Sequence, residues 1–330
     1  MRALLSVSPG GPETLSLASV PDPIAREDEV LIAIRNCALN YPDVLLIQDL
    51  YQMRPPRPFS PGSEVAGIVE AVGANVTAFK PGDRVIGLAA WGGLAEKLAV
   101  HQSSCIAIPD EVSFGIAAAL VVTFATSHYA LRGQADLKPG ETLLVLGASG
   151  GIGSAAVQLG KAMGARVVAA VSSPDKAELA HSMGADASVI YPADLHDRTR
   201  ARDFTTLLKT HGPYDVILDP VGGPYTESAI RAIEWQGRYL VAGFTAGIPA
   251  LPLNLTLLKS AKIIGVSYGD FSRRDLRTRQ IYLDEVFAHF AAKRIRPHVS
   301  LELPLERAPE GLAMLGDRRA AGKIVIEIAR

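Results

Sequence analysis

Cysteine is almost absent from this chain of 330 residues, which contains only Cys37 and Cys105 and no CxxC pair. Two isolated thiols exclude a disulfide framework and a structural zinc site made of four cysteines. The seven histidines also stand alone, since none forms an HxxxH or HxH pair. The sequence therefore predicts no metal site.

Long hydrophobic runs and blocks of like charge are also missing. No stretch approaches the roughly 20 apolar residues of a membrane helix, and the N-terminus lacks the pattern of a signal peptide. The longest apolar run, residues 115–124, is expected to form a buried helix. With 33 basic and 34 acidic residues, the chain has no basic block for binding nucleic acid. We expect a cytoplasmic protein without nucleic-acid or membrane partners.

The composition that is present suits a compact α/β protein, because 48% of the residues are hydrophobic and 20% are charged. Residues 1–110 contain short β-rich segments, such as 30–34 and 65–69, between Pro/Gly turns. This pattern predicts an antiparallel, barrel-like β domain. The chain is long enough to form a second domain as well.

From about residue 112 the pattern changes to helices that alternate with strands. A helix is expected at 113–132, followed by strands at 142–146, 167–171, 187–190, 216–218 and 238–242, with helices at 152–163, 175–183, 199–210 and 228–233. Such alternation predicts a doubly wound, parallel sheet. The strand-like end, residues 323–328, is expected to return to the first domain. The predicted domains are therefore 1–115 with 260–330, and 116–259.

The strongest local motif lies where the strand at 142–146 meets a glycine-rich turn and a helix. Its A-x-G-x-x-G register places Ala148, Gly150 and Gly153 at the small positions. Small residues permit a tight turn, close approach of the backbone to a pyrophosphate, and close helix–strand contact. The helix N-terminus offers N–H groups to phosphates. We expect the residues of this turn to bind a dinucleotide: Ala148, Ser149, Gly150, Gly151, Ile152 and Gly153.

The end of the next strand indicates which dinucleotide is bound. NAD enzymes usually place a carboxylate there to bind the ribose 2′-hydroxyl. Here the strand is followed by Ser172 and Ser173, with Lys176 nearby. Ser173 and Pro174 have the pattern of N-cap and first residue of a helix, which places Asp175 in the first turn. Hydroxyls and an ammonium suit a 2′-phosphate, so NADPH is the expected cofactor.

Several segments together resemble the medium-chain dehydrogenase/reductase superfamily, and within it the quinone oxidoreductase branch. They are residues 40–43 (Asn-Tyr-Pro-Asp), 61–67 (Pro-Gly-Ser-Glu-Val-Ala-Gly), 80–85 (Lys-Pro-Gly-Asp-Arg-Val), the glycine loop, 219–223 (Asp-Pro-Val-Gly-Gly) and 322–325 (Gly-Lys-Ile-Val). The resemblance implies a GroES-like β domain completed by the C-terminal tail, with an inserted Rossmann domain. It also implies a homodimer with the active site between the domains.

The departures from the zinc-dependent members of this superfamily are informative. Those proteins carry cysteine where this chain has Asn40, and histidine where it has Ser63. Amides and hydroxyls are poor ligands for zinc. Without a Lewis acid to polarise a simple ketone, the expected substrate is one that accepts hydride readily. The resemblance therefore implies NADPH-dependent, zinc-independent reduction of a quinone or another conjugated carbonyl compound.

Further site residues follow from their positions in the resemblance. Tyr191 and Lys176 are expected near the 2′-phosphate, Thr126 near the nicotinamide, and Arg318 and Lys323 near the adenosine phosphate. Ligands of open α/β sheets bind at the carboxyl ends of the strands. The cofactor site is therefore expected to include the three residues after the strand at 238–242, namely Gly243, Phe244 and Thr245.

Two residues are candidates for work on the substrate. Asn40 is expected to orient the nicotinamide or the substrate through amide hydrogen bonds. Tyr51 matches a tyrosine that related enoyl reductases place beside the substrate, where a phenol donates a hydrogen bond or a proton. Two alternatives stay open: an enone or enoyl-thioester reductase, and an NADPH-binding protein with a regulatory or structural role and little turnover.

Overall fold

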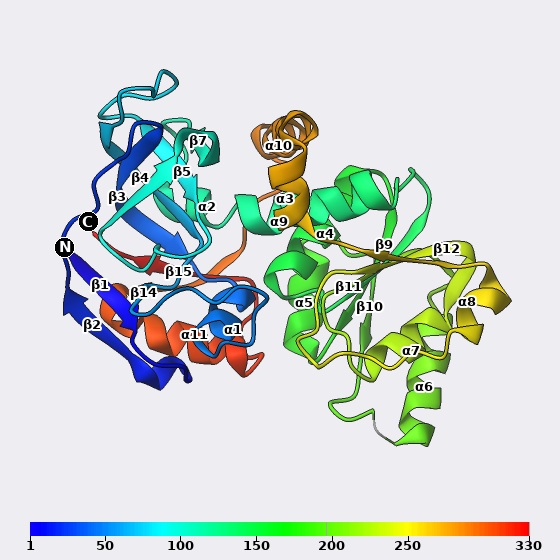
Figure 1. Ribbon diagram of the computed structural model, residues 1–330. Helices are drawn as coiled ribbons and strands as arrows, with labels where there is room; N and C mark the ends of the chain where they lie inside the picture. The colour runs from blue at the N-terminus through cyan, green and yellow to red at the C-terminus, as the bar shows by residue number, and fades with distance from the viewer. Residues whose placement is uncertain (196, 330) are drawn as a thin grey trace. The chain divides into compact units, whose positions relative to one another are not determined.

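The computed structural model describes residues 1–195 and 197–329. The chain divides into two compact units (Figure 1). Unit 1 consists of Met1–Val121 and Pro297–Arg330, and unit 2 consists of Val122–Arg296. Both ends of the chain belong to unit 1, so unit 2 is an insertion.

The units have different bounds from the predicted domains, mainly because the chain leaves unit 2 at residue 296 rather than 259. The reason lies in the segment 260–296. Strand β13 (Lys262–Gly265) extends the sheet of unit 2 by pairing in parallel with β12 (Ile233–Val241). Helix α10 (Leu276–Ala291) then packs against α3 (Val121–His128), where the rings of Tyr282 and His128 lie 5.2 Å apart.

Unit 1 is built on a seven-stranded sheet with the order β14-β15-β3-β4-β5-β7, and β6 pairs with β3. The strands are β3 (Glu29–Ala38), β4 (Glu64–Val72), β5 (Arg84–Leu88), β6 (Lys97–His101), β7 (Cys105–Ala107), β14 (Val299–Pro304) and β15 (Lys323–Glu327). A separate hairpin joins β1 (Arg2–Ser6) to β2 (Leu15–Ser19).

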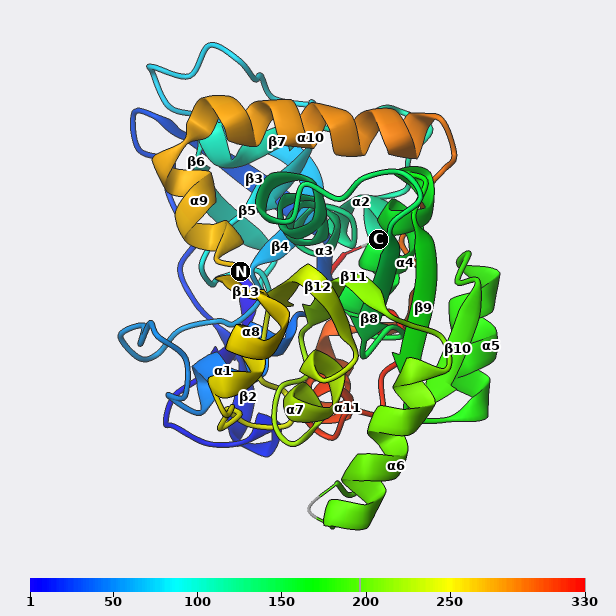
Figure 2. The same cartoon turned by 90° about the vertical axis from the view of Figure 1, so that its right-hand side faces the viewer.

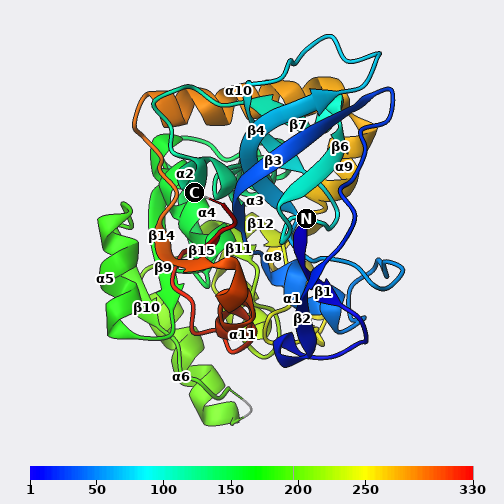
Figure 3. The ribbon, with the colours of Figure 1, turned by 90° about the vertical axis from the view of Figure 1, so that its left-hand side faces the viewer.

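The C-terminal strand completes this sheet, as the sequence predicts. Strand β15 pairs antiparallel with β3 and parallel with β14 (Figure 3). The sheet is therefore antiparallel except for this last pair, whose strands are joined through α11 (Ala308–Gly316). The other helices of unit 1 are α1 (Tyr41–Ile47) and α2 (Phe114–Ala118), with single turns at Pro12–Thr14, Gln102–Ser104 and Leu305–Arg307.

Unit 2 is a parallel six-stranded sheet with the order β10-β9-β8-β11-β12-β13 (Figure 2). Its remaining strands are β8 (Thr142–Leu146), β9 (Arg166–Val171), β10 (Ala187–Ile190) and β11 (Tyr214–Asp219). In chain order this is 3-2-1-4-5-6, the doubly wound arrangement of dinucleotide-binding domains. The direction of winding reverses between β8 and β11, and ligands of such sheets bind at the carboxyl ends of these strands.

Helices connect these parallel strands, as strand crossovers require. They are α4 (Gly151–Ala162), α5 (Pro174–Ser182), α6 (Arg198–Lys209), α7 (Tyr225–Ile230) and α8 (Asn254–Lys259), followed by α9 (Tyr268–Arg274) and α10. The buried strands Leu143–Leu146 and Val167–Val171 are almost wholly inaccessible to solvent, which explains their continuous apolar runs. The predicted alternation of strands and helices is confirmed within a few residues at each end.

One predicted helix, residues 113–132, is wrong as a single element. The structure divides it into α2, α3 and a π-helical segment, Tyr129–Gln134. Helix α2 ends because the backbone N–H groups of Ala119 and Leu120 form i→i+3 rather than i→i+4 hydrogen bonds. The boundary between unit 1 and unit 2 follows at residues 121 and 122. Within residues 1–195 and 197–329, no helix is both long and apolar enough to cross a membrane.

Candidate functional site

The glycine-rich turn lies at the carboxyl end of β8, on the side of the sheet where the winding reverses. Gly147 has φ +58°, a left-handed conformation that favours glycine. A Cβ atom on Gly153 would lie 2.1 Å from the carbonyl oxygen of Gly147, so only glycine fits there. The turn therefore brings α4 as close to β8 as the backbones permit, and Gly150 is the N-cap of α4.

Helix α4 directs its first N–H groups out of the turn, where they have no partner within the helix. With the helix dipole, they form a site suited to a pyrophosphate. Helix α3 is tied to this end because the hydroxyl of Ser127 donates to the carbonyl oxygen of Ile152 over 2.9 Å. This bond holds Thr126, the neighbour of Ser127, close to the turn. The geometry suits the roles expected for residues 148–153.

The carboxyl end of β9 gathers the residues expected to bind a 2′-phosphate. Ser173 is the N-cap of α5, and its hydroxyl accepts from the backbone N–H of Lys176 over 3.4 Å. The ammonium of Lys176 lies 3.3 Å from the hydroxyl oxygen of Ser172. Asp175 occupies the first turn of α5 and is exposed. The predicted cap and the position of Asp175 are confirmed, and no carboxylate ends the strand itself.

Tyr191 follows β10, the strand beside β9. Its backbone N–H donates to the carbonyl oxygen of Val171 over 2.9 Å, which places it next to the end of β9. Its ring packs against Tyr225 with centroids 4.8 Å apart, and also lies near Phe204. The aromatic packing fixes the ring at the carboxyl edge of the sheet, near Ser172.

The loops after β11 and β12 are joined to each other, which places Gly243, Phe244 and Thr245 at the same edge. The backbone N–H of Ala246 donates to Val221 over 2.7 Å, and that of Gly223 donates to Gly247 over 2.7 Å. A Cβ on Gly147 would lie 2.9 Å from a methyl of Val221, so the loop after β11 also approaches the glycine-rich turn. Three strand ends thus form one continuous edge.

Asp219 organises this edge, although its role was not predicted from the sequence. It is 2% exposed, and one carboxylate oxygen accepts from the N–H groups of Val221 and Gly222 over 2.7 and 2.8 Å. The other oxygen accepts from the hydroxyls of Thr226 and Tyr239 over 2.8 and 2.6 Å. An aspartate at the end of a buried strand and before Pro-Val-Gly-Gly was the available signal.

In unit 1, Asn40 belongs to a buried polar cluster. Asn40 is the N-cap of α1, and its backbone N–H donates to Asp43 over 2.8 Å. Its side-chain oxygen accepts from the ammonium of Lys323 over 2.6 Å, and its side-chain nitrogen lies 3.4 Å from the Glu64 carboxylate. Asn40, Asp43, Glu64 and Lys323 are all at most 6% exposed. Asp43 therefore caps the first turn of α1.

Burial changes the proton affinities of this cluster. Removal from water raises the pKa of Asp43 to about 6, although N–H groups of Asn40 and Gly62 and the charge of Lys323 act against that rise. Burial also raises the pKa of the Cys37 thiol well above its ordinary value, and the nearby carboxylates Asp43 and Glu64 add to the effect. Cys37 is therefore a neutral, packed thiol at physiological pH.

The other predicted residues of unit 1 lie in loops. Tyr51 follows α1 and is partly buried against the hydrophobic core of the unit. Its loop is held by Arg57, which forms a 2.8 Å ion pair with Asp49 and donates to the carbonyl oxygen of Ile47. Arg318 lies between α11 and β15, is exposed, and has a left-handed φ of 58°. The catalytic or cofactor roles of Tyr51 and Arg318 stay predictions.

Lys323 is buried, unlike a surface cation that is accessible to a phosphate. It is 3% exposed, and its ammonium donates to the carbonyl oxygen of Leu39 over 3.1 Å as well as to Asn40. The Glu64 carboxylate lies 3.4 Å away. Its charge is therefore already balanced within unit 1, and its predicted contact with the adenosine phosphate is untested.

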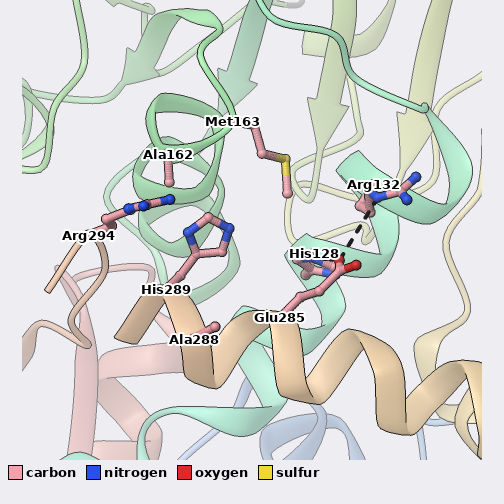
Figure 4. Close-up of a pocket in the computed structure, with 8 residues that line it drawn as sticks. All are labelled: His128, Arg132, Ala162, Met163, Glu285, Ala288, His289 and Arg294. Carbon is pink, nitrogen blue, oxygen red and sulfur yellow. Dashed lines mark ion pairs between the residues drawn. The ribbon is translucent and has the colours of Figure 1, made fainter. Parts of the chain in front are cut away.

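A cavity of about 420 Å³ lies in unit 2, at the end of α4 remote from the glycine-rich turn. Figure 4 shows His289 and Arg294 on one side of it, and His128, Arg132 and Glu285 on the other. Because α4 rises about 1.5 Å per residue, roughly 17 Å separate this cavity from the turn. Burial lowers the pKa of His128 to about 4.

Across the part of the chain that the structure describes, no group of three or more His, Cys, Asp or Glu residues is arranged to hold a metal ion.

Comparison with known proteins places these features in a family. Residues 26–110 match the alcohol dehydrogenase GroES-like domain, and residues 151–283 match the zinc-binding dehydrogenase family. A protein from Bos taurus called quinone oxidoreductase-like protein 2 is 33% identical over 93% of this chain and 87% of its own length.

Solved structures agree with that match. The quinone oxidoreductase from Thermus thermophilus, also solved in complex with NADPH, has 30% identity and a TM-score of 0.83, over 99% of this chain and all of its own. The Escherichia coli quinone oxidoreductase complexed with NADPH has 25% identity and a TM-score of 0.89 over similar lengths. The chain belongs to the quinone oxidoreductase branch of the medium-chain dehydrogenase/reductase superfamily and is an NAD(P)H-dependent oxidoreductase of that type.

Proposed function

We propose that this protein transfers hydride from NADPH to a quinone or another conjugated carbonyl compound, without zinc. The observation that carries the proposal is the edge of the parallel sheet, where the glycine-rich turn and the Ser172–Lys176 pair adjoin. The turn suits a pyrophosphate, and the pair suits a 2′-phosphate. The bound NADPH would supply the hydride, and the chain would bind and orient both reactants.

The choice of NADPH over NADH rests on the charges at the end of β9. Lys176 brings one positive charge, and Ser172 and Ser173 bring hydroxyls. A carboxylate at this position would repel a 2′-phosphate, but Asp175 lies in the first turn of α5, where it interacts favourably with the helix dipole. Two quinone oxidoreductases with the same fold are solved with NADPH, which supports the same choice here.

The choice of a conjugated acceptor rests on the donors available in unit 1. Asn40 offers an amide, and Ser63 offers a hydroxyl, where zinc-dependent members place cysteine and histidine. These groups suit hydrogen bonding to an oxygen that gains negative charge rather than binding of zinc. A quinone or enone spreads that charge onto oxygen without a Lewis acid. Tyr51 is the proposed donor of a further hydrogen bond or proton.

A panel of acceptors tests this proposal with purified protein and NADPH. The panel contains a para-quinone, an ortho-quinone, an enone, an enoyl thioester and a saturated ketone. We expect turnover of the quinones and slower turnover of the enone, with none of the saturated ketone. Preference for the enoyl thioester would favour the reductase alternative. NADPH binding without turnover of any acceptor would favour a regulatory role and would contradict the proposal.

We also propose that the protein is a homodimer. Among the described strands, β13 has a neighbour on one side only, so its other edge presents unpaired backbone groups. Large apolar side chains are exposed on β13 and on the helix before it, with exposed fractions of 42% for Ile263 and 78% for Leu257 on α8. Apolar groups at an open sheet edge favour association with a second copy. Sedimentation velocity is expected to give a dimer that Leu257→Asp weakens; a monomeric wild type would contradict the proposal.

A further inference from the structure

The buried ammonium of Lys323 has an unusual set of partners in unit 1. It donates to the side-chain oxygen of Asn40 over 2.6 Å and to the carbonyl oxygen of Leu39 over 3.1 Å, and it lies 3.4 Å from the Glu64 carboxylate. These three acceptors match the three protons of an ammonium group. Because β15 begins at Lys323, the last strand delivers this cation to α1 and β4.

The arrangement fixes which way the Asn40 amide points. An ammonium can only donate, so the atom 2.6 Å from it must be the amide oxygen. The amide nitrogen is then directed toward the carbonyl oxygen of Ala38 and the Glu64 carboxylate, at 3.3 and 3.4 Å. These two contacts are long for N–H donors. The amide oxygen of Asn40 is therefore held by a short hydrogen bond, whereas its N–H groups are held only by long ones.

A cation bonded to an amide oxygen also polarises the whole amide. Hydrogen-bond chains strengthen one another in a medium of low dielectric constant, and both Lys323 and Asn40 are at most 6% exposed. Each Asn40 N–H therefore becomes a stronger donor than that of an isolated amide. The backbone of Asn40 is fixed in turn by the 2.8 Å bond to Asp43.

We propose that Lys323 is a positioning residue that holds the Asn40 amide in one orientation and strengthens its N–H groups, whose contacts with Ala38 and Glu64 are long, as donors shared with the acceptor's carbonyl oxygen. This inference rests on the proposed function, because it assigns Asn40 to the oxygen that gains charge. It differs from a role for Lys323 as a ligand of a cofactor phosphate. The carboxylate of Glu64 balances the charge of Lys323, which permits both side chains to be buried in the core of unit 1.

Steady-state kinetics and NADPH titration of Lys323→Met separate the two roles. We expect kcat for a quinone to fall about tenfold to a hundredfold, as for a weakened oxyanion donor, and NADPH affinity to stay within about twofold. Lys80→Met, an 82% exposed lysine of unit 1, is the matched control and should change neither quantity. A loss of NADPH affinity with unchanged kcat would instead make Lys323 a phosphate ligand and overturn the proposal.

A double-mutant cycle tests whether Lys323 acts through Asn40. If it does, Lys323→Met adds little to the loss caused by Asn40→Ala, and additive losses would overturn the proposal. Lys323→Arg should recover part of the rate, because a guanidinium can still donate to Asn40. If Lys323→Met does not fold, Lys323→Met with Glu64→Gln removes both buried charges and is measured in its place.

An NMR measurement does not depend on turnover. The two side-chain N–H signals of Asn40, assigned with Asn40→Ala, should exchange slowly with solvent in the wild type, and should shift and exchange faster in Lys323→Met. Unchanged signals in the variant would overturn the proposal. If the wild type turned over no acceptor, the proposed function would be wrong. The NMR result would still show whether Lys323 is bonded to Asn40.

Discussion

The ammonium of Lys176 lies 3.3 Å from the hydroxyl oxygen of Ser172, at the end of the second strand of the parallel sheet. The pair joins Ser172, two residues before the start of α5, to Lys176 in the first turn of that helix, and Ser173 between them is the N-cap. A hydroxyl and an ammonium at this distance can both donate hydrogen bonds to the same phosphate group. This relationship is the structural basis for the proposed preference for NADPH.

Removing this cation should reduce the preference. We expect the wild type to bind NADPH at least about tenfold more tightly than NADH, which corresponds to about 1.4 kcal/mol. Lys176→Met should remove most of that difference by weakening NADPH alone, because NADH lacks the 2′-phosphate. Titration of both cofactors measures it, with Lys209→Met on α6 as the control. Equal affinities in the wild type would indicate that Asp175 binds the ribose of NADH.

The contact between Gly153 and Gly147 should make one glycine of the turn far less tolerant than another. A methyl group at residue 153 would lie 2.1 Å from the Gly147 oxygen, whereas one at residue 150 would lie 3.4 Å from it. Gly153→Ala should therefore lower the free energy of unfolding by about 1–3 kcal/mol through overpacking and weaken NADPH binding. Gly150→Ala is the matched control, and urea unfolding compares the two. Equal losses would contradict this explanation of the turn.

The phenol of Tyr51 should matter more for an enone than for a quinone. Tyr51→Phe is expected to lower kcat for an enone by about 10²- to 10⁴-fold, the range of general acid catalysis. An enone needs a proton or hydrogen bond after hydride arrives, whereas water can protonate a reduced quinone. NADPH affinity should change little. Full activity of the variant toward every acceptor would make Tyr51 a packing residue of its loop.

Asp43 should give stability a measurable dependence on pH. Burial raises its pKa to about 6 in the folded protein, against 3.8 for the free side chain. The folded state therefore keeps the proton over a range where the unfolded state has lost it. The resulting stabilisation is complete below pH 3.8 and is lost as pH rises to about 6.

Comparison with Asp43→Asn isolates this effect from other carboxylates. The difference in unfolding free energy between wild type and variant should fall by up to about 3 kcal/mol between pH 4 and 6. Urea unfolding across this range measures it. A difference that stays constant, or rises with pH, would mean that Asp43 is ionised throughout and stabilised by its neighbours.

Much of this architecture is predictable because its signals are local. The glycine-rich turn, the cap at Ser173 and the alternating strands of unit 2 depend on residues within a few positions of one another. The parallel, doubly wound character of the sheet follows from the same alternation. The edge at β9 could therefore be located from the sequence.

The features that could not be predicted depend on contacts between residues that are far apart in the sequence. Lys323 and Asn40 are 283 residues apart, and nothing in the local pattern around Lys323 distinguishes a buried partner from a surface cation. Asp219 and Tyr239 meet only because β11 and β12 are neighbours in the sheet. The chain leaves unit 2 at residue 296 because β13 and α10 pack there, and this packing has no clear signal in the sequence.

The most direct test of the central claim is NADPH oxidation by a para-quinone, measured together with the zinc content of the same sample before and after dialysis against a chelator. We predict well under one zinc per chain in both samples, turnover that the chelator leaves intact, and a rate that falls when the transferred hydrogen of NADPH is replaced by deuterium. One equivalent of tightly held zinc whose removal abolishes turnover would contradict the claim.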